Sequence, residues 1–156
     1  MTTNLETESE VVLVVDDEEA IRMVLTEVLV DDGFRTLEAS DGKSAMEWID
    51  GGAHIDLLIA DMGLPGNMNG RQLADAARHS RPDLKVVYIS GYGEDKIMGD
   101  GPLKPGEFML IKPFTGTRLA TLIVAILANN KSNSDTEHAL TDANSQPRIA
   151  RQYYSH

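Results

Sequence analysis

The chain has 156 residues, of which 42% are hydrophobic, and this is enough for one domain with a sizeable core. It contains no cysteine, so disulfides and thiolate metal sites are excluded and any metal must bind oxygen or histidine ligands. The formal net charge of −11 argues against direct binding to nucleic acid, which relies on a basic face. We expect a cytoplasmic protein without membrane insertion, because neither a secretory signal pattern nor a membrane-length apolar stretch is present.

Polar segments flank the central part of the chain. Residues 1–9 are polar and acidic, and residues 131–156 are rich in Ser, Asn, Asp and Thr without an apolar period. We expect the first segment to be flexible and the second to be a disordered tail, which leaves residues 10–130 as the domain. The tail has neither a second core nor a basic patch, so we expect a single-domain protein without a DNA-binding output domain.

Between these segments, short apolar runs alternate with helical patterns. Val11–Val15 is rich in β-branched residues and too short for a buried helix, so it predicts a strand covered on both faces. Four further strands are expected: Phe34–Glu38, Ile55–Ala60, Leu84–Ile89 and Glu107–Ile111.

A helix is expected after each strand, because apolar residues recur there at helical spacing and turn residues follow most of these patterns. The expected ranges are 18–30, 43–49, 70–80, 94–98 and 115–128. The fourth should be short and weakly held, since its surroundings are rich in Gly and Pro. The first helix places on one face Ile21, Val24, Leu25, Val28 and Leu29, and the last Leu119, Leu122, Ile123, Ile126 and Leu127.

This alternation of five strands with five helices predicts an α/β fold. Connections of this length force neighbouring strands into parallel pairing, so a doubly wound parallel sheet results. In such sheets, binding and chemistry gather beyond the carboxyl ends of the strands.

Chemically active side chains follow four of the predicted strands. Strand one is followed by Asp16 and Asp17, strand three by Asp61, strand four by Ser90, and strand five by Lys112. Each residue by itself has a structural explanation, such as helix capping or a solvated surface charge. A lysine after a strand caps nothing, however, and the whole set meets at one edge. Oxygen ligands there suit Mg²⁺, so the sequence predicts a functional site at this edge of the sheet.

Four motifs then identify a family. The segments VVDDEE, IADMGLPGNMNG, YISGYG and LIKPF, in this order and spacing, closely resemble the receiver domain of two-component response regulators over about residues 11–129. The resemblance implies a flavodoxin-like sheet with strand order 2-1-3-4-5. It also implies an aspartate that takes a phosphoryl group from a histidine kinase or a histidine phosphotransfer protein.

The motif match assigns roles to individual residues. Asp61 is the implied phosphoacceptor, and Asp16 and Asp17 are the acidic pair that holds Mg²⁺, for which Mn²⁺ could substitute. The remaining metal ligands are Asp61 and the backbone carbonyl of Gly63. Lys112 supplies a positive charge to the phosphoryl group.

The residues around the acceptor complete the implied switch. Ser90 is the switch hydroxyl, and Gly91 beside it leaves room for the phosphoryl group. Pro113 follows the lysine at a position where the family usually has a cis bond.

The chain departs from the usual family pattern at the switch residue and at the positions that tune hydrolysis. Met109 stands where the family usually has a switch aromatic, and it either acts as a flexible plug or simply fills a gap in a cluster at the strand edge. Gly63 and Tyr92 occupy the positions that tune hydrolysis of the acyl phosphate, so the phosphoryl lifetime could shift in either direction.

We expect a phosphoacceptor regulator that signals by contact with a downstream target protein or by phosphorelay. It would not be an enzyme beyond its own phosphorylation and dephosphorylation, and would be a monomer or weak dimer. One alternative is a pseudo-receiver that docks partners without phosphorylation. Another is a haloacid dehalogenase-like phosphohydrolase, although that family requires a second aspartate where this chain has Glu18.

Overall fold

The computed structural model describes residues 9–91 and 102–131. The strands are β1 (Val11–Val15), β2 (Arg35–Ala39), β3 (Leu57–Asp61), β4 (Lys85–Ser90) and β5 (Glu107–Ile111). The helices in these ranges are α1 (Glu19–Asp31), α2 (Gly42–Asp50), α3 (Gly70–Ser80) and α4 (Gly116–Lys131). The helix expected at 94–98 lies outside the described residues. Every other predicted element is present, with its ends shifted by three residues or fewer.

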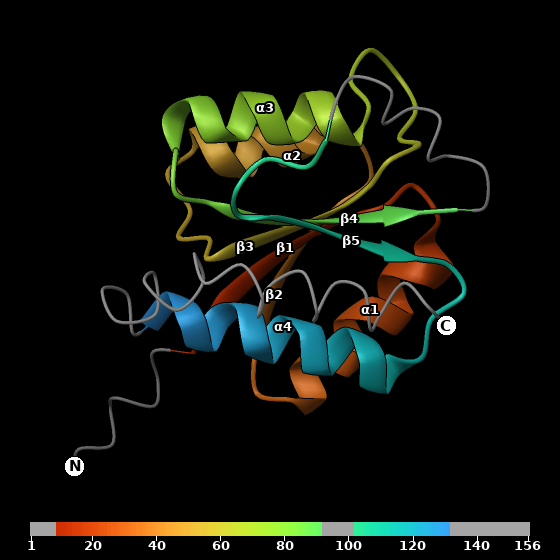
Figure 1. Ribbon diagram of the computed structural model, residues 1–156. Coiled ribbons are helices and arrows are strands. Elements are labelled where there is room, and N and C mark those ends of the chain that lie inside the picture. The colour runs from red at the N-terminus through yellow and green to blue at the C-terminus, as the bar shows by residue number, and fades with distance from the viewer. Residues whose placement is uncertain (1–8, 92–101, 132–156) are drawn as a thin grey trace.

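The five strands form one parallel sheet in the order β2-β1-β3-β4-β5, which confirms the predicted topology. Helices α2 and α3 cover one face, and α1 and α4 cover the other (Figure 1). Parallel neighbours require a crossover connection, and α1, α2 and α3 provide the crossovers in the chain from β1 to β4. All carboxyl ends of the strands therefore lie at the same edge of the sheet.

Strand β1 is apolar along its whole length because its side chains pack into a core on each face of the sheet. Leu13 and Val15 pack into the core beneath α2 and α3, whereas Val12 and Val14 pack into the core beneath α1 and α4. Alternate side chains of a strand point to opposite faces, so a strand covered on both faces has no polar side.

The helix faces agree with the sequence pattern except at one residue. In α4 all five residues of the predicted apolar face are buried. In α1, Leu25 and Leu29 are buried, but Val24 is 54% exposed, so its placement on the buried face was wrong. Consecutive residues of a helix point about 100° apart. Because Leu25 points into the core, Val24 lies at the edge of the apolar face and is left exposed to solvent.

Side-chain caps fix where α2 and α3 begin. Asp41 accepts the backbone N–H of Ser44 at 2.8 Å, and Asn69 accepts that of Gln72 at 2.8 Å. The Ser44 amide and hydroxyl hold the pKa of Asp41 below its usual value. The Asn69 cap starts α3 immediately behind the loop that follows β3.

Candidate functional site

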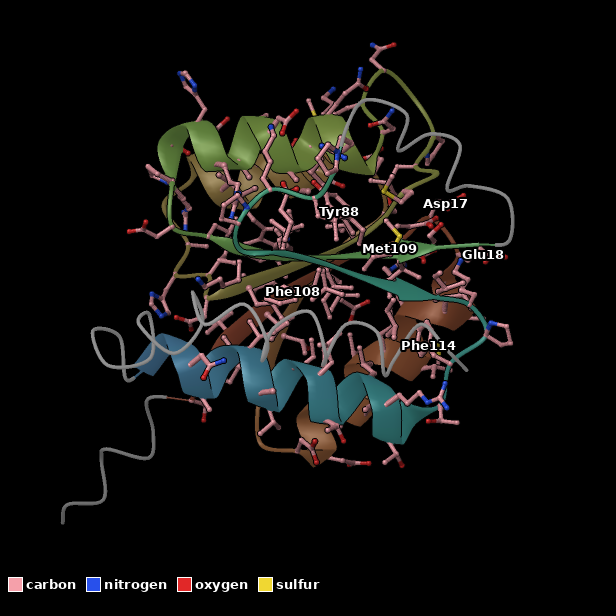
Figure 2. The ribbon with its side chains drawn as sticks, in the orientation of Figure 1. Asp17, Glu18, Tyr88, Phe108, Met109 and Phe114 are labelled. Atoms are coloured by element: carbon pink, nitrogen blue, oxygen red, sulfur yellow. The ribbon has the colours of Figure 1, made fainter. Side chains whose placement is uncertain are left out.

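The predicted site residues lie at the carboxyl edge of the sheet. Asp16 and Asp17 follow β1, Asp61 and Ser90 are the last residues of β3 and β4, and Lys112 follows β5. Because β1, β3, β4 and β5 are adjacent in the sheet, their ends approach one another. Figure 2 shows Asp17 and the neighbouring Glu18 at the end toward which the strand arrows point.

Three carboxylates form an acidic cluster, consisting of Asp16, Asp17 and Asp61. One carboxylate oxygen from each lies within 4.8 Å of the others. Asp16 and Asp61 are buried and Asp17 is exposed, so the cluster has a solvent-facing side. Such a group of oxygen donors, open on one side, is the kind of site that suits a hard divalent cation.

Most polar groups of Asp16 have defined partners. Its backbone N–H donates to the carbonyl of Ala39 at 3.2 Å, and its Oδ1 accepts the backbone N–H of Glu18 at 2.9 Å. Among the residues that the structure describes, its buried Oδ2 has no hydrogen-bond partner. Burial raises the pKa of Asp16, while the Glu18 amide and then the Lys112 charge oppose this rise. Its carboxylate form therefore gains from an added positive charge.

Lys112 brings a positive charge to Asp61. Its Nζ lies 3.8 Å from Asp61 Oδ1, and its side chain is 29% exposed. The backbone N–H of Lys112 donates to the carbonyl of Ser90 at 2.8 Å, which extends the β4–β5 ladder beyond the end of β5. The Lys112–Pro113 peptide bond is cis. The lysine thus lies beside the Asp61 carboxylate.

The remaining predicted residues surround this centre. Ser90 is buried, and its hydroxyl donates to the carbonyl of Gly91 at 3.2 Å. Gly63 lies on the exposed loop after β3. Met109 is 7% exposed and packs in the core on the α2 and α3 side. Its partner in the β4–β5 register is Tyr88, which lies in the same core. Tyr92 lies outside the described residues.

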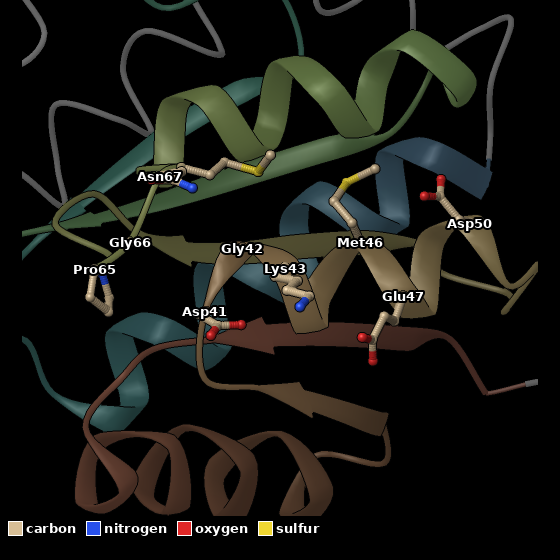
Figure 3. Close-up of a pocket in the computed structure, with 10 residues that line it drawn as sticks. Asp41, Gly42, Lys43, Met46, Glu47, Asp50, Pro65, Gly66 and Asn67 are labelled. Carbon is tan, nitrogen blue, oxygen red and sulfur yellow. The ribbon is translucent and has the colours of Figure 1, made fainter.

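A hollow of about 640 Å³ lies elsewhere, between α2 and the loop after β3 (Figure 3). Met46 and Met68 contribute to its lining, and Asp41, Glu47 and Asp50 add acidic groups. The lining includes no member of the acidic cluster, so the candidate site rests on the strand ends and not on this hollow.

The site geometry agrees with the comparison against protein families. A sequence model of the response regulator receiver domain matches residues 12–124. The chain belongs to this family. The match begins at the second residue of β1 and includes the other four strands, so the acidic cluster and Lys112 fall inside the receiver domain.

Related proteins and structures include other receiver domains. The chain is 34% identical to the sensor kinase CckA of Brucella abortus over 120 residues, which are 76% of this chain and 13% of that kinase. It is 31% identical to sporulation initiation phosphotransferase F of Bacillus subtilis over 55% of this chain and 68% of the relative. The crystal structure of a response regulator receiver protein from Sinorhizobium medicae has a TM-score of 0.71 and 32% identity, covering 78% of this chain and 97% of that one.

Two residues of this receiver domain that contact the site were not found from the sequence. Arg22 of α1 donates from Nη1 to the backbone carbonyl of Asp16 at 2.8 Å. Gly70 begins α3 so close to β3 that a Cβ there would collide with the carbonyl of Asp61. Arg22 follows the acidic segment within one turn of the helix, which is a usable signal. Gly70 is the last residue of the IADMGLPGNMNG segment and follows an N-cap residue, but neither observation reveals its contact with Asp61.

Proposed function

We propose that this receiver domain accepts a phosphoryl group on the carboxylate of Asp61 from a phosphohistidine of a partner protein. The observation that carries the proposal is the meeting of Asp61 with two other carboxylates and the Lys112 ammonium at one sheet edge. Receiver domains interact with histidine kinases or phosphotransfer proteins, and the similarity to a sensor kinase and to a phosphotransferase supports this class of donor.

Transfer would make Asp61 a nucleophile. A bond forms between its carboxylate oxygen and phosphorus, while the bond between phosphorus and the donor imidazole nitrogen breaks and the electron pair leaves with the nitrogen. Lys112 lies beside Asp61 and would balance negative charge on the phosphoryl oxygens. The Ser90 hydroxyl, which donates to the neighbouring Gly91 carbonyl, would rotate to donate to a phosphoryl oxygen instead.

The acidic cluster fits Mg²⁺, the cation that receiver domains bind at an acidic pocket. Its donors are oxygens, and the buried Asp16 Oδ2 has no hydrogen-bond partner within residues 9–91 and 102–131. We assign the cation to Asp16, Asp17, Asp61 and the backbone carbonyl of Gly63, with Mn²⁺ as a substitute. When bound, the cation offsets charge on the transferred phosphoryl group.

The response side of the switch is assigned to Ser90 and Met109. Met109 is buried on β5 and pairs with Tyr88, two residues before Ser90 on β4. Because Met is unbranched and adapts to the space around it, we propose that it repacks when Ser90 turns toward the phosphoryl group.

Intact-mass measurement tests the proposal. The protein is incubated with Mg²⁺ and either acetyl phosphate or a phosphorylated histidine phosphotransfer protein. We expect a single phosphoryl adduct that requires Mg²⁺ and is absent in Asp61→Asn. Asp56→Asn is the matched control, since Asp56 contacts the backbone of Val11 at the opposite end of β1. No adduct from either donor, in wild-type protein shown to be folded, would refute the proposal and favour the pseudo-receiver alternative.

A further inference from the structure

Arg22 bridges two parts of the fold behind the acidic cluster. Its Nη1 donates to the backbone carbonyl of Asp16 at 2.8 Å, and its Nε donates to Glu38 Oε1 on β2 at 3.3 Å. The side chain of Arg22 is 17% exposed, against 49% for Glu38. A guanidinium is a planar group with several fixed donors, so two acceptors together define its orientation.

The carbonyl that Arg22 contacts belongs to the peptide bond between Asp16 and Asp17. The Asp16 side chain is held separately, because its Oδ1 accepts the backbone N–H of Glu18. One oxygen of the same carboxylate belongs to the acidic cluster. Fixing the carbonyl constrains the plane of this peptide bond, and that plane determines the direction in which Asp17 leaves the backbone. Arg22 therefore acts on both aspartates without being part of the cluster.

We propose that Arg22 is a positioning residue for the cation site: it orients the Asp16–Asp17 peptide so that both carboxylates converge on Mg²⁺. This inference rests on the proposed function, because it requires the acidic cluster to bind the cation. Residues that orient metal ligands typically change metal affinity by about 10- to 100-fold when they are removed. The expected effect is thus large enough to measure.

A purely electrostatic role for Arg22 predicts a change of the opposite sign. A positive charge close to a cation site repels the cation, so its removal alone would tighten Mg²⁺ binding. Loss of positioning weakens binding, because the carboxylates must then be ordered when the cation binds. The direction of the change in affinity separates the two roles.

The test measures the Mg²⁺ dissociation constant of the unphosphorylated full chain by isothermal titration calorimetry at constant ionic strength. We expect Arg22→Met to weaken binding about 10-fold. Arg22→Lys should be intermediate, since an ammonium keeps the charge but not the two-acceptor geometry. The matched control is Arg35→Met, which removes an exposed positive charge from the same strand as Glu38 and should leave the affinity unchanged or slightly tighter.

Circular dichroism confirms that each variant is folded before titration. Unchanged or tighter binding in folded Arg22→Met would overturn the inference, and so would an equal loss in Arg35→Met. If Arg22→Met does not fold, Arg22→Lys decides: a several-fold loss supports positioning, and wild-type affinity overturns it. Absence of Mg²⁺ binding in the wild-type protein would instead refute the metal assignment, and the inference with it, so the two failures are distinguishable.

Discussion

The buried contact between Tyr88 and Glu107 leads to a prediction about stability. The Tyr88 hydroxyl donates to Glu107 Oε2 at 3.0 Å, and Glu107 Oε1 accepts the backbone N–H of Lys104 at 2.8 Å. Arg78 Nη1 lies 3.8 Å from the same Oε2, and the Arg71 guanidinium lies 5.9 Å from the centre of the Tyr88 ring. Tyr88 is 0% exposed and Glu107 is 3% exposed. The hydroxyl therefore offsets part of the cost of burying a carboxylate.

Tyr88→Phe keeps the ring and removes this hydroxyl, so a buried carboxylate oxygen loses its hydrogen bond. A hydrogen bond to a charged group is worth about 1.5–3 kcal/mol. A loss of about 2 kcal/mol in a domain of this size lowers Tm by about 8 °C. Urea unfolding at neutral pH, followed by far-UV circular dichroism, measures the change. A change below about 0.5 kcal/mol would refute the reasoning, because it lies below the range for a bond to a charged group.

The same pair predicts a pH dependence. Burial first, and then the Glu107 carboxylate, raise the pKa of Tyr88 above its ordinary value of 10.0. Above that pH the unfolded chain releases the tyrosine proton while the folded protein retains it, so stability present below pH 10.0 falls as the pH rises. Tyr88→Phe lacks this loss. The stability gap between wild type and variant should therefore narrow between neutral and strongly alkaline pH, and a constant gap would contradict the assignment.

Two further substitutions test the site. Gly70→Ala should cost about 1–3 kcal/mol in urea unfolding, because its Cβ would collide with the Asp61 carbonyl. Gly116→Ala, also at a helix start, is the control, because its Cβ would meet a side chain, that of Val28 at 3.0 Å, and not the backbone. An equal loss of stability in both variants would contradict the explanation. Asp16→Asn should raise Tm in EDTA, since it removes a charge that burial disfavours, and should reduce stabilisation by Mg²⁺ in calorimetry. A lower Tm in EDTA would contradict this.

The parts of the fold that were predictable from sequence depend on local pattern. Val11–Val15 is buried along its whole length, and that burial is what its uninterrupted apolar run encodes. Asp61 and Ser90 could be placed at one edge because parallel strands end on the same side. The strand order itself came from the family resemblance, since local pattern does not determine which strands are neighbours.

The parts that were missed depend on contacts between distant segments. Glu107 looked like the polar first residue of a strand, yet it is buried by partners that include Tyr88, 19 positions earlier. The contact between Gly70 and Asp61 arises from how closely α3 packs on β3, which no spacing in the chain reveals. Val24 was misplaced for a related reason, because periodicity gives the centre of a buried stripe better than its edges.

The backbone around Asp61 is held on several sides, and this bears on how the switch would work. Asp61 pairs with β4, and the next residue, Met62, donates its backbone N–H to Ile89 and accepts that of Gly70. Because the main chain here is fixed, we expect an added phosphoryl group to be accommodated by side chains that turn about single bonds. For the Ser90 hydroxyl, turning would exchange its hydrogen bond to the Gly91 carbonyl for a stronger one to a charged phosphoryl oxygen. A rigid acceptor beside a movable donor thus favours a response that begins at the end of β4.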